Sequence, residues 1–224
     1  PGFNRQYSIK QISSNAYDYF INKANVPGSI KGEQMSKDDK LNEHLLNFKK
    51  VAEEWMGKAD FIKEYYEFFR QFTEKDNLLN AEWEDIQEIG SHTHAFTSMA
   101  LAKTKALGRP NHPIEHYRNS FLMLVHGEGE IEDRIRSFCT DDKYKIKNFG
   151  KSVISEILGF IFPEKYVFFN KRDRFAIEYL GLMPAFERGD KFIDKFFKFN
   201  DAVSKIVPSY ESIVGKQTES PINF

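Results

Sequence analysis

Residues 144–161 carry the pattern on which the fold prediction depends, and they read Tyr-Lys-Ile-Lys-Asn-Phe-Gly-Lys-Ser-Val-Ile-Ser-Glu-Ile-Leu-Gly-Phe-Ile. Asn148-Phe149-Gly150 is typical of a tight turn, because asparagine and glycine tolerate backbone conformations that other residues avoid. The apolar residues after Ser152 recur at the three- and four-residue spacing of an α-helix. We therefore predict a hairpin at Gly150 and a new helix that begins near Lys151.

Helical spacing of apolar residues recurs along most of the chain. Four further runs cover residues 41–55, 61–72, 117–125 and 192–207. Breaks with glycine or proline, or both, fall at residues 26–28, 107–110, 127–129, 148–150, 162–163 and 181–184. Only residues 166–169 have the character of an extended segment. The pattern predicts an all-α protein with about nine or ten helices joined by short turns.

The chain of 224 residues is long enough for one large domain or for two lobes that share a core. We expect an N-terminal helical lobe at residues 1–108 and a second lobe, which contains the hairpin, at residues 109–207. Residues 208–224 are expected to form a tail or linker. We also expect this chain to be part of a longer protein.

The charge balance excludes a globally basic nucleic-acid-binding protein. The chain has 32 basic and 33 acidic residues, so any surface for nucleic acid must be a local patch. The single cysteine, Cys139, excludes an internal disulfide and fits a reducing compartment, so we expect a cytoplasmic protein. No apolar run approaches the length of a membrane span, and we predict no contact with a membrane.

Such a local patch surrounds the predicted hairpin. Lys143, Lys145, Lys147 and Lys151 lie within nine residues, and no acid occurs from residue 143 to residue 155. The first backbone N–H groups of a helix have no partner within the helix and lie at the positive end of its dipole, which favours anions. The sequence therefore predicts a phosphate-binding site. A solvated corner whose lysines only confer solubility is the alternative interpretation.

The segment from Ile146 to Leu182 resembles the helix-hairpin-helix region of the DNA glycosylase superfamily. Its hairpin is Asn148-Phe149-Gly150, its extended stretch is residues 166–170, and its second helix ends in Leu180-Gly181-Leu182. The resemblance implies DNA binding by the hairpin and by the residues that follow the extended stretch. The expected DNA-binding residues are Lys145, Lys147, Asn148, Phe149, Gly150, Lys151, Ser152, Asn170, Lys171 and Arg172.

The same comparison argues against catalysis. The resemblance places the nucleophilic lysine of such enzymes at Ser152 and their catalytic aspartate at Asn170. Asparagine cannot supply the negative charge that stabilises a sugar cation. We therefore expect no catalytic residues and no cofactor in this chain. We interpret the chain as a non-catalytic DNA-binding domain.

The whole chain is also similar to the N-terminal DNA-recognition regions of McrB-like AAA+ restriction proteins. The stretches that carry this similarity are residues 29–34, 111–120 and 168–172. The similarity implies recognition of DNA, including modified DNA, in a restriction or antiphage defence system. It also implies a C-terminal AAA+ motor and a nuclease subunit as partners. No Walker motif occurs within these 224 residues.

Two histidines raise the question of a metal site. His112-Pro113-Ile114-Glu115-His116 matches a zinc-binding pattern in which two histidines lie one helical turn apart. The same residues also fit a helix start in which Asn111 caps the helix and His112 is exposed. We favour the helix start and predict no metal. Arg118 and Asn119 follow on the same helix, where they are candidates for contact with bases.

Three functional hypotheses remain open. The first is the non-catalytic DNA-binding domain of a nucleotide-dependent restriction or defence protein. The second is an active helix-hairpin-helix glycosylase whose nucleophile is displaced, and Ser152 and Asn170 argue against it. The third is a helical protein-interaction module, which steeply salt-dependent DNA binding would exclude.

Overall fold

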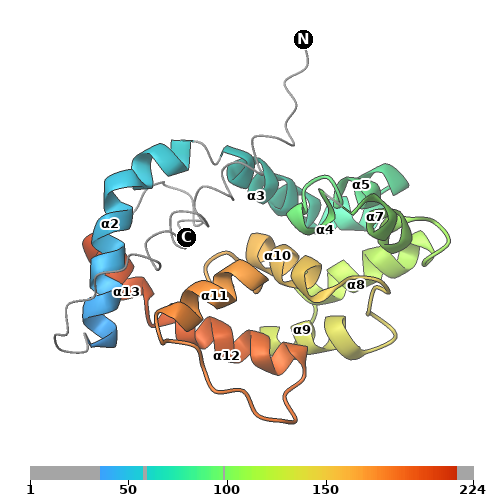
Figure 1. Cartoon of the computed structure of the whole chain (residues 1–224). Helices are drawn as coiled ribbons and strands as arrows, with labels where there is room; N and C mark the ends of the chain where they lie inside the picture. The colour runs from blue at the N-terminus through green and yellow to red at the C-terminus, as the bar shows by residue number, and fades with distance from the viewer. Residues whose placement is uncertain (1–35, 58–59, 98, 216–224) are drawn as a thin grey trace. The chain divides into compact units, whose positions relative to one another are not determined.

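Helices make up the regular structure of the computed structural model, which describes residues 36–57, 60–97 and 99–215 (Figure 1). No strand occurs in this part of the chain, so the prediction of an all-α protein is confirmed. None of its helices is both long enough and apolar enough to cross a membrane. The helices are α2 (Lys37–Gly57), α3 (Asp60–Phe72), α4 (Lys75–Asn80), α5 (Trp83–Glu88), α6 (His94–Thr97), α7 (Ala100–Leu107), α8 (Ile114–His126), α9 (Ile131–Thr140), α10 (Lys151–Ile161), α11 (Lys171–Tyr179), α12 (Phe192–Ser204) and α13 (Val207–Ile213).

Helix ends follow the glycine and proline breaks of the sequence. α7 ends at Leu107, directly before Gly108, and α8 ends at His126, directly before Gly127. α10 begins at Lys151, as predicted from the hairpin. The described residues contain twelve helices, more than expected, because short helices such as α4 and α6 lack a recognisable apolar period. The break at residues 26–28 lies outside the described residues.

One aromatic-rich core contains residues from both predicted lobes. Its buried members run from Ile62 to Phe199, so residues on both sides of Gly108 belong to it. Phe69 of α3 stacks on Phe160 of α10, with ring centroids 5.8 Å apart. The central helix is α10, which is buried at every residue from 153 to 160 and packs against α3 and α6. Much of the high aromatic content therefore belongs to the core.

A second, smaller apolar cluster joins the two ends of the described region. It contains Leu41, Leu45 and Ala52 of α2 together with Tyr210 and Val214. The helix α13 thus lies largely within residues 208–224, where we expected a tail or linker. The cause is the four-residue spacing of Ile206, Tyr210 and Val214, which places these side chains on one helix face. Residues 216–224 lie outside the described part.

A buried carboxylate links the central helix to α6. Glu156 of α10 is 7% exposed, and it accepts hydrogen bonds from the backbone N–H groups of His94 and Ala95, the latter at 2.8 Å. These groups open α6, so Glu156 satisfies donors that the helix itself cannot. Burial raises the pKa of Glu156 to about 7, against the opposing effect of these two backbone hydrogen bonds.

Glu156 gives the protein a pH-dependent stability with a definite sign. The folded state retains the Glu156 proton up to about pH 7, whereas the unfolded chain releases it near its ordinary pKa of 4.5. The stability that wild type has over Glu156→Gln should therefore fall as pH rises from about 5 to 8, by roughly 1–3 kcal/mol. Chemical denaturation of both proteins across this range measures the difference. Glu164→Gln, at an exposed position after α10, is the control, and a difference independent of pH would contradict the expectation.

Candidate functional site

The loop of residues 141–150 joins α9 to α10 and carries most of the predicted lysine cluster. Its turn residue is Asn148, the one described non-glycine residue with a positive φ, at 66°. The tolerance of asparagine for this conformation was the basis for predicting the hairpin, and the structure places the turn there. Phe149 is 9% exposed and meets Phe96 of α6 edge-on, with ring centroids 6.1 Å apart. Phe149 therefore anchors the loop in the core, and contacts with a ligand fall to its exposed neighbours.

Asn111 fixes the backbone of this loop from the other side. Its Nδ2 lies 3.0 Å from the carbonyl oxygen of Lys147 and 2.8 Å from that of Ala106, at the end of α7. It also lies 3.2 Å from the hydroxyl of Tyr117, a fully buried residue of α8. Asn148 Nδ2 in turn donates to Asn111 Oδ1 at 3.2 Å. Asn111 thus connects α7, α8 and the loop.

This arrangement corrects the role expected for Asn111. We predicted that Asn111 caps the following helix, but α8 begins at Ile114 with Pro113 at its cap position and no side-chain cap hydrogen bond. The cap prediction was wrong because the Asn111 side chain donates to the carbonyl oxygen of Lys147 instead. This carbonyl lies 36 positions away in the sequence, so no local pattern indicates it.

Two histidines hold the same loop through its backbone. His112 Nε2 accepts a hydrogen bond from the backbone N–H of Lys147 at 3.1 Å. His116 Nε2 lies 3.0 Å from the carbonyl oxygen of Lys145. The two imidazole rings stack, with centroids 3.9 Å apart and planes at 5°. The histidines of the zinc-like pattern therefore bind the loop, and no group of three or more potential ligands that could hold a metal occurs in the described residues.

The loop lysines keep their side chains exposed. Lys145, Lys147 and Lys151 form no ion pair with any acid of the described residues, whereas Lys198 pairs with Asp190 at 2.9 Å. A further exposed lysine near the loop, Lys105, was not among the predicted DNA-binding residues. It is exposed at the end of α7, and its carbonyl oxygen lies 3.4 Å from Asn148 Nδ2. No local pattern identifies it, because 43 positions separate it from Asn148.

The first turn of α10 is open to solvent. Gly150 precedes the helix with φ −75° and ψ 166°, a conformation available to any residue. No atom lies within 4 Å of the position that a Cβ would occupy there. The backbone N–H groups of residues 151–153 have no partner among the described residues, and Ser152 is exposed. The backbone therefore does not require glycine at this position, and the glycine leaves free space beside three unpaired donors.

The second part of the predicted site opens α11. Asn170 caps this helix, because its Oδ1 accepts hydrogen bonds from the N–H groups of Arg172 at 2.8 Å and Asp173 at 3.1 Å. Lys171 and Arg172 are exposed on the first turn. No hydrogen bond or ion pair between described residues joins this turn to the loop of residues 141–150. The loop reaches α6 through the contact of Phe149 with Phe96. Burial, followed by the charge of Arg172, lowers the pKa of His94 of the same helix.

Arg118, predicted as a candidate for contact with bases, has a structural role. Arg118 donates to the carbonyl oxygen of Ala81 through Nε at 2.9 Å and Nη2 at 2.6 Å, so its guanidinium is already bound. Burial raises the pKa of the Cys139 thiol to about 12, which makes its thiolate scarce.

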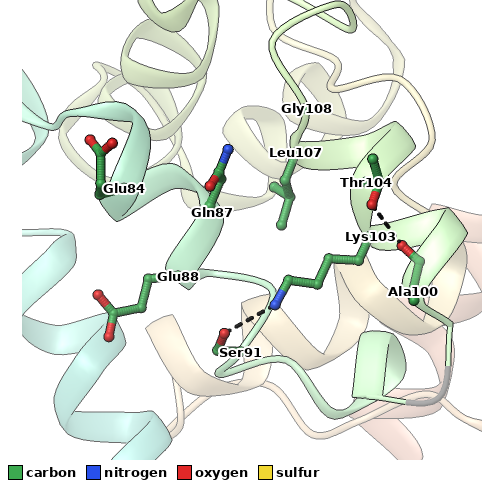
Figure 2. Close-up of a pocket in the computed structure, with 9 residues that line it drawn as sticks. All are labelled: Glu84, Gln87, Glu88, Ser91, Ala100, Lys103, Thr104, Leu107 and Gly108. Atoms are coloured by element: carbon green, nitrogen blue, oxygen red, sulfur yellow. Dashed lines mark hydrogen bonds between the residues drawn. The ribbon is translucent and has the colours of Figure 1, made fainter.

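A groove lies between α5 and α7 and is lined by no residue of the loop (Figure 2). Glu84 and Glu88 line one side, and Lys103 lines the other. Lys103 Nζ donates to Ser91 Oγ at 3.0 Å, which already satisfies part of the polar lining. The groove is wide and open, and no buried polar group without a partner lies among its lining residues.

Comparison with known proteins adds no relative. No protein-family model, curated protein or solved structure matches the chain. The similarities to DNA glycosylases and to McrB-like proteins therefore stay predictions, and the stretch at residues 29–34 lies outside the described residues.

Exchange of a single atom of Asn111 should disrupt its hydrogen bonds to α7 and to the loop and destabilise the fold. Asn111→Asp replaces the Nδ2 donor with an oxygen that faces the carbonyl oxygens of Ala106 and Lys147. We expect a loss of about 2–3 kcal/mol in the free energy of unfolding, measured by urea denaturation near neutral pH. Asn119→Asp, on the exposed side of α8, is the matched control. Equal effects of the two substitutions would show that Asn111 is not a structural connection.

Proposed function

We propose that this chain is a non-catalytic DNA-binding domain and that the loop of residues 141–150, with the start of α10, grips phosphate. The observation that carries the proposal is a lysine-bearing loop whose backbone is fixed on several sides, while Lys145 and Lys147 form no ion pair with a described acid. Asn111, His112 and His116 bind backbone atoms of the loop, and Phe149 anchors it in the core. None of these contacts uses a lysine ammonium group.

Fixing the backbone supports binding for an energetic reason. A disordered lysine loop loses conformational entropy when it binds, and each ordered residue costs about 1–2 kcal/mol. In a loop that is already ordered, this cost has been met by folding. The loop then presents its positive charges without this further cost. When these charges neutralise phosphates, counterions are released from the DNA, and the affinity of the protein for DNA increases.

The start of α10 adds directional donors to these charges. The N–H groups of residues 151–153 have no partner in the described part of the chain, and the space beside Gly150 is open. A phosphate oxygen placed there would meet several donors at the positive end of the helix dipole. This chemistry positions a protein on DNA without reading its sequence.

The first turn of α11 supplies a second group of basic residues. Lys171 and Arg172 are exposed there, and the Asn170 cap fixes the start of the helix. We propose that they contact the same DNA at another phosphate. Asn170 contributes by holding this turn, since its Oδ1 is occupied by two backbone donors.

The wider context of the proposal comes from the resemblances. A helix-hairpin-helix-like unit, followed elsewhere in the parent protein by an AAA+ motor and accompanied by a nuclease subunit, would make this chain the targeting domain of a cytoplasmic restriction or defence system. Recognition of modified DNA belongs to the same proposal.

Charge reversal in the loop should weaken DNA binding. Lys147→Glu and Lys151→Glu should each lower affinity for all duplexes alike and flatten the plot of log affinity against log salt by about one unit. Gly150→Asp should lower affinity by about tenfold or more, because it adds bulk and negative charge beside the open amides. The measurement is a salt titration with short duplexes, with and without cytosine or adenine modification.

Matched controls separate binding from folding. Gly150→Ala tests bulk without charge, since the backbone conformation at this position suits alanine. Lys63→Glu and Lys75→Glu reverse exposed charges on α3 and α4. If the loop variants bind like these controls while circular dichroism shows intact helices, the proposal fails and the chain is an unassigned helical domain.

One observation favours the glycosylase as a second candidate. Burial raises the pKa of Asp173 to about 6, and this residue lies three positions after Asn170. Together with Glu156, whose pKa is about 7, it has the proton affinity that general acid–base catalysis uses. Glu156 is nevertheless committed to the N–H groups of His94 and Ala95.

We expect the protein to release no base from damaged or methylated duplexes. Overnight incubation followed by alkaline cleavage of the DNA strand detects abasic products with high sensitivity. The residues expected to supply the nucleophile and the charge are replaced by Ser152 and Asn170, and Ser152 forms no side-chain hydrogen bond with the described residues. An abasic product that disappears in Asp173→Asn would instead establish the chain as an enzyme.

A further inference from the structure

Hydrogen-bond direction determines the protonation state of His112. The partner of His112 Nε2 is the backbone N–H of Lys147, which can only donate. His112 Nε2 must therefore carry no proton, and the neutral ring holds its proton on Nδ1. A protonated ring would turn a second N–H toward the N–H of Lys147 and lose this hydrogen bond.

His116 has the opposite requirement. Its Nε2 faces the carbonyl oxygen of Lys145, which can only accept, so this nitrogen carries a proton. The cationic form of His116 preserves that proton and the hydrogen bond. The two stacked rings therefore respond differently to acid, and only His112 loses its contact with the loop.

We propose that His112 is a pH-sensitive switch for the loop of residues 141–150, and that it holds the backbone N–H of Lys147 when neutral and releases it when protonated. The consequence for DNA affinity rests on the function proposed above, but the release of this N–H does not. Asn111 still holds the carbonyl oxygen of Lys147, His116 that of Lys145, and Phe149 the core end of the loop, so the release is confined to the backbone N–H of Lys147.

The surroundings of His112 favour the neutral form. The titratable and charged groups that face the ring are His116 in the stack, Lys147 of the loop and the ring edge of Tyr117, whose centroid is 5.9 Å away. Lys145 adds a further cation through its contact with His116. Burial, followed by the charges of His116 and Lys147, lowers the pKa of His112 below its ordinary value. The Lys147 N–H is therefore held at neutral pH and released in acid, as the pH falls through the lowered pKa of His112.

Nuclear magnetic resonance of the wild-type protein tests the switch without any variant. At neutral pH the ¹⁵N shifts should identify His112 as the Nδ1–H form and His116 as carrying a proton on Nε2. On acidification the backbone amide of Lys147 should shift with the midpoint of His112. A proton on Nε2 of His112 at neutral pH, or a Lys147 amide that does not respond, would overturn the proposal.

Two substitutions sharpen the test. His112→Gln offers an amide oxygen that accepts from Lys147 at every pH, so the transition of the Lys147 amide should disappear. His116→Gln retains a donor toward Lys145 and removes a cation that opposes protonation of His112, so the transition should persist with a higher midpoint. The same transition in His112→Gln as in wild type would overturn the proposal.

DNA affinity provides the functional readout. As the pH falls through the midpoint of the Lys147 amide, wild type should lose about threefold or more in affinity relative to His112→Gln, because the Lys147 backbone then lacks one of the contacts that order it and must be ordered again on binding. A relative gain for wild type would show that the added charge outweighs the release and would overturn the switch as a regulator of binding. If neither protein binds DNA at any pH while the Lys147 amide still titrates with His112, the proposed function fails and the loop switch stands.

Discussion

The burial of α10 on all sides is the constraint on which the rest of the described structure depends. Residues 153–160 are all buried, so the helix cannot leave a polar group there without a partner. Its one ionisable member, Glu156, is accommodated by the free amides of α6. That contact places α6 against α10, and Phe96 of α6 in turn contacts Phe149 of the loop of residues 141–150. The candidate site is arranged around this central pair of helices.

In the candidate site, the residues that position the loop are different from the residues that carry positive charge. Asn111, His112 and His116 come from the start of α8 and the turn before it, and they contact the loop. Lys145 and Lys147 of the loop are exposed and form no ion pair with an acid of the described residues. Because the positioning groups and the charged groups lie on different segments, loss of binding and loss of folding can be separated experimentally.

Much of the architecture could be predicted from sequence because it depends on local chemistry. Apolar spacing predicted the long helices and the start of α10, and the tolerance of Asn148 for a positive φ predicted the turn before it. The Asn111 network could not be predicted, because its acceptors lie on segments that only the folded chain brings together. The sequence does indicate that Glu156 has a partner, because a single acid inside a buried apolar run requires one. Its partner, the short helix α6, has no apolar period that would reveal it.

The contacts that hold the loop have a further consequence for its sequence. At residues 145 and 147 the positioning groups bind only backbone atoms, a C=O and an N–H that every residue other than proline provides. The side chains at these positions are therefore not constrained by the support beneath them. Asn111, His112 and His116 would hold the backbone of a neutral or acidic loop in the same way. Substitutions at these two positions can therefore change which ligands the surface prefers and leave the fold unchanged.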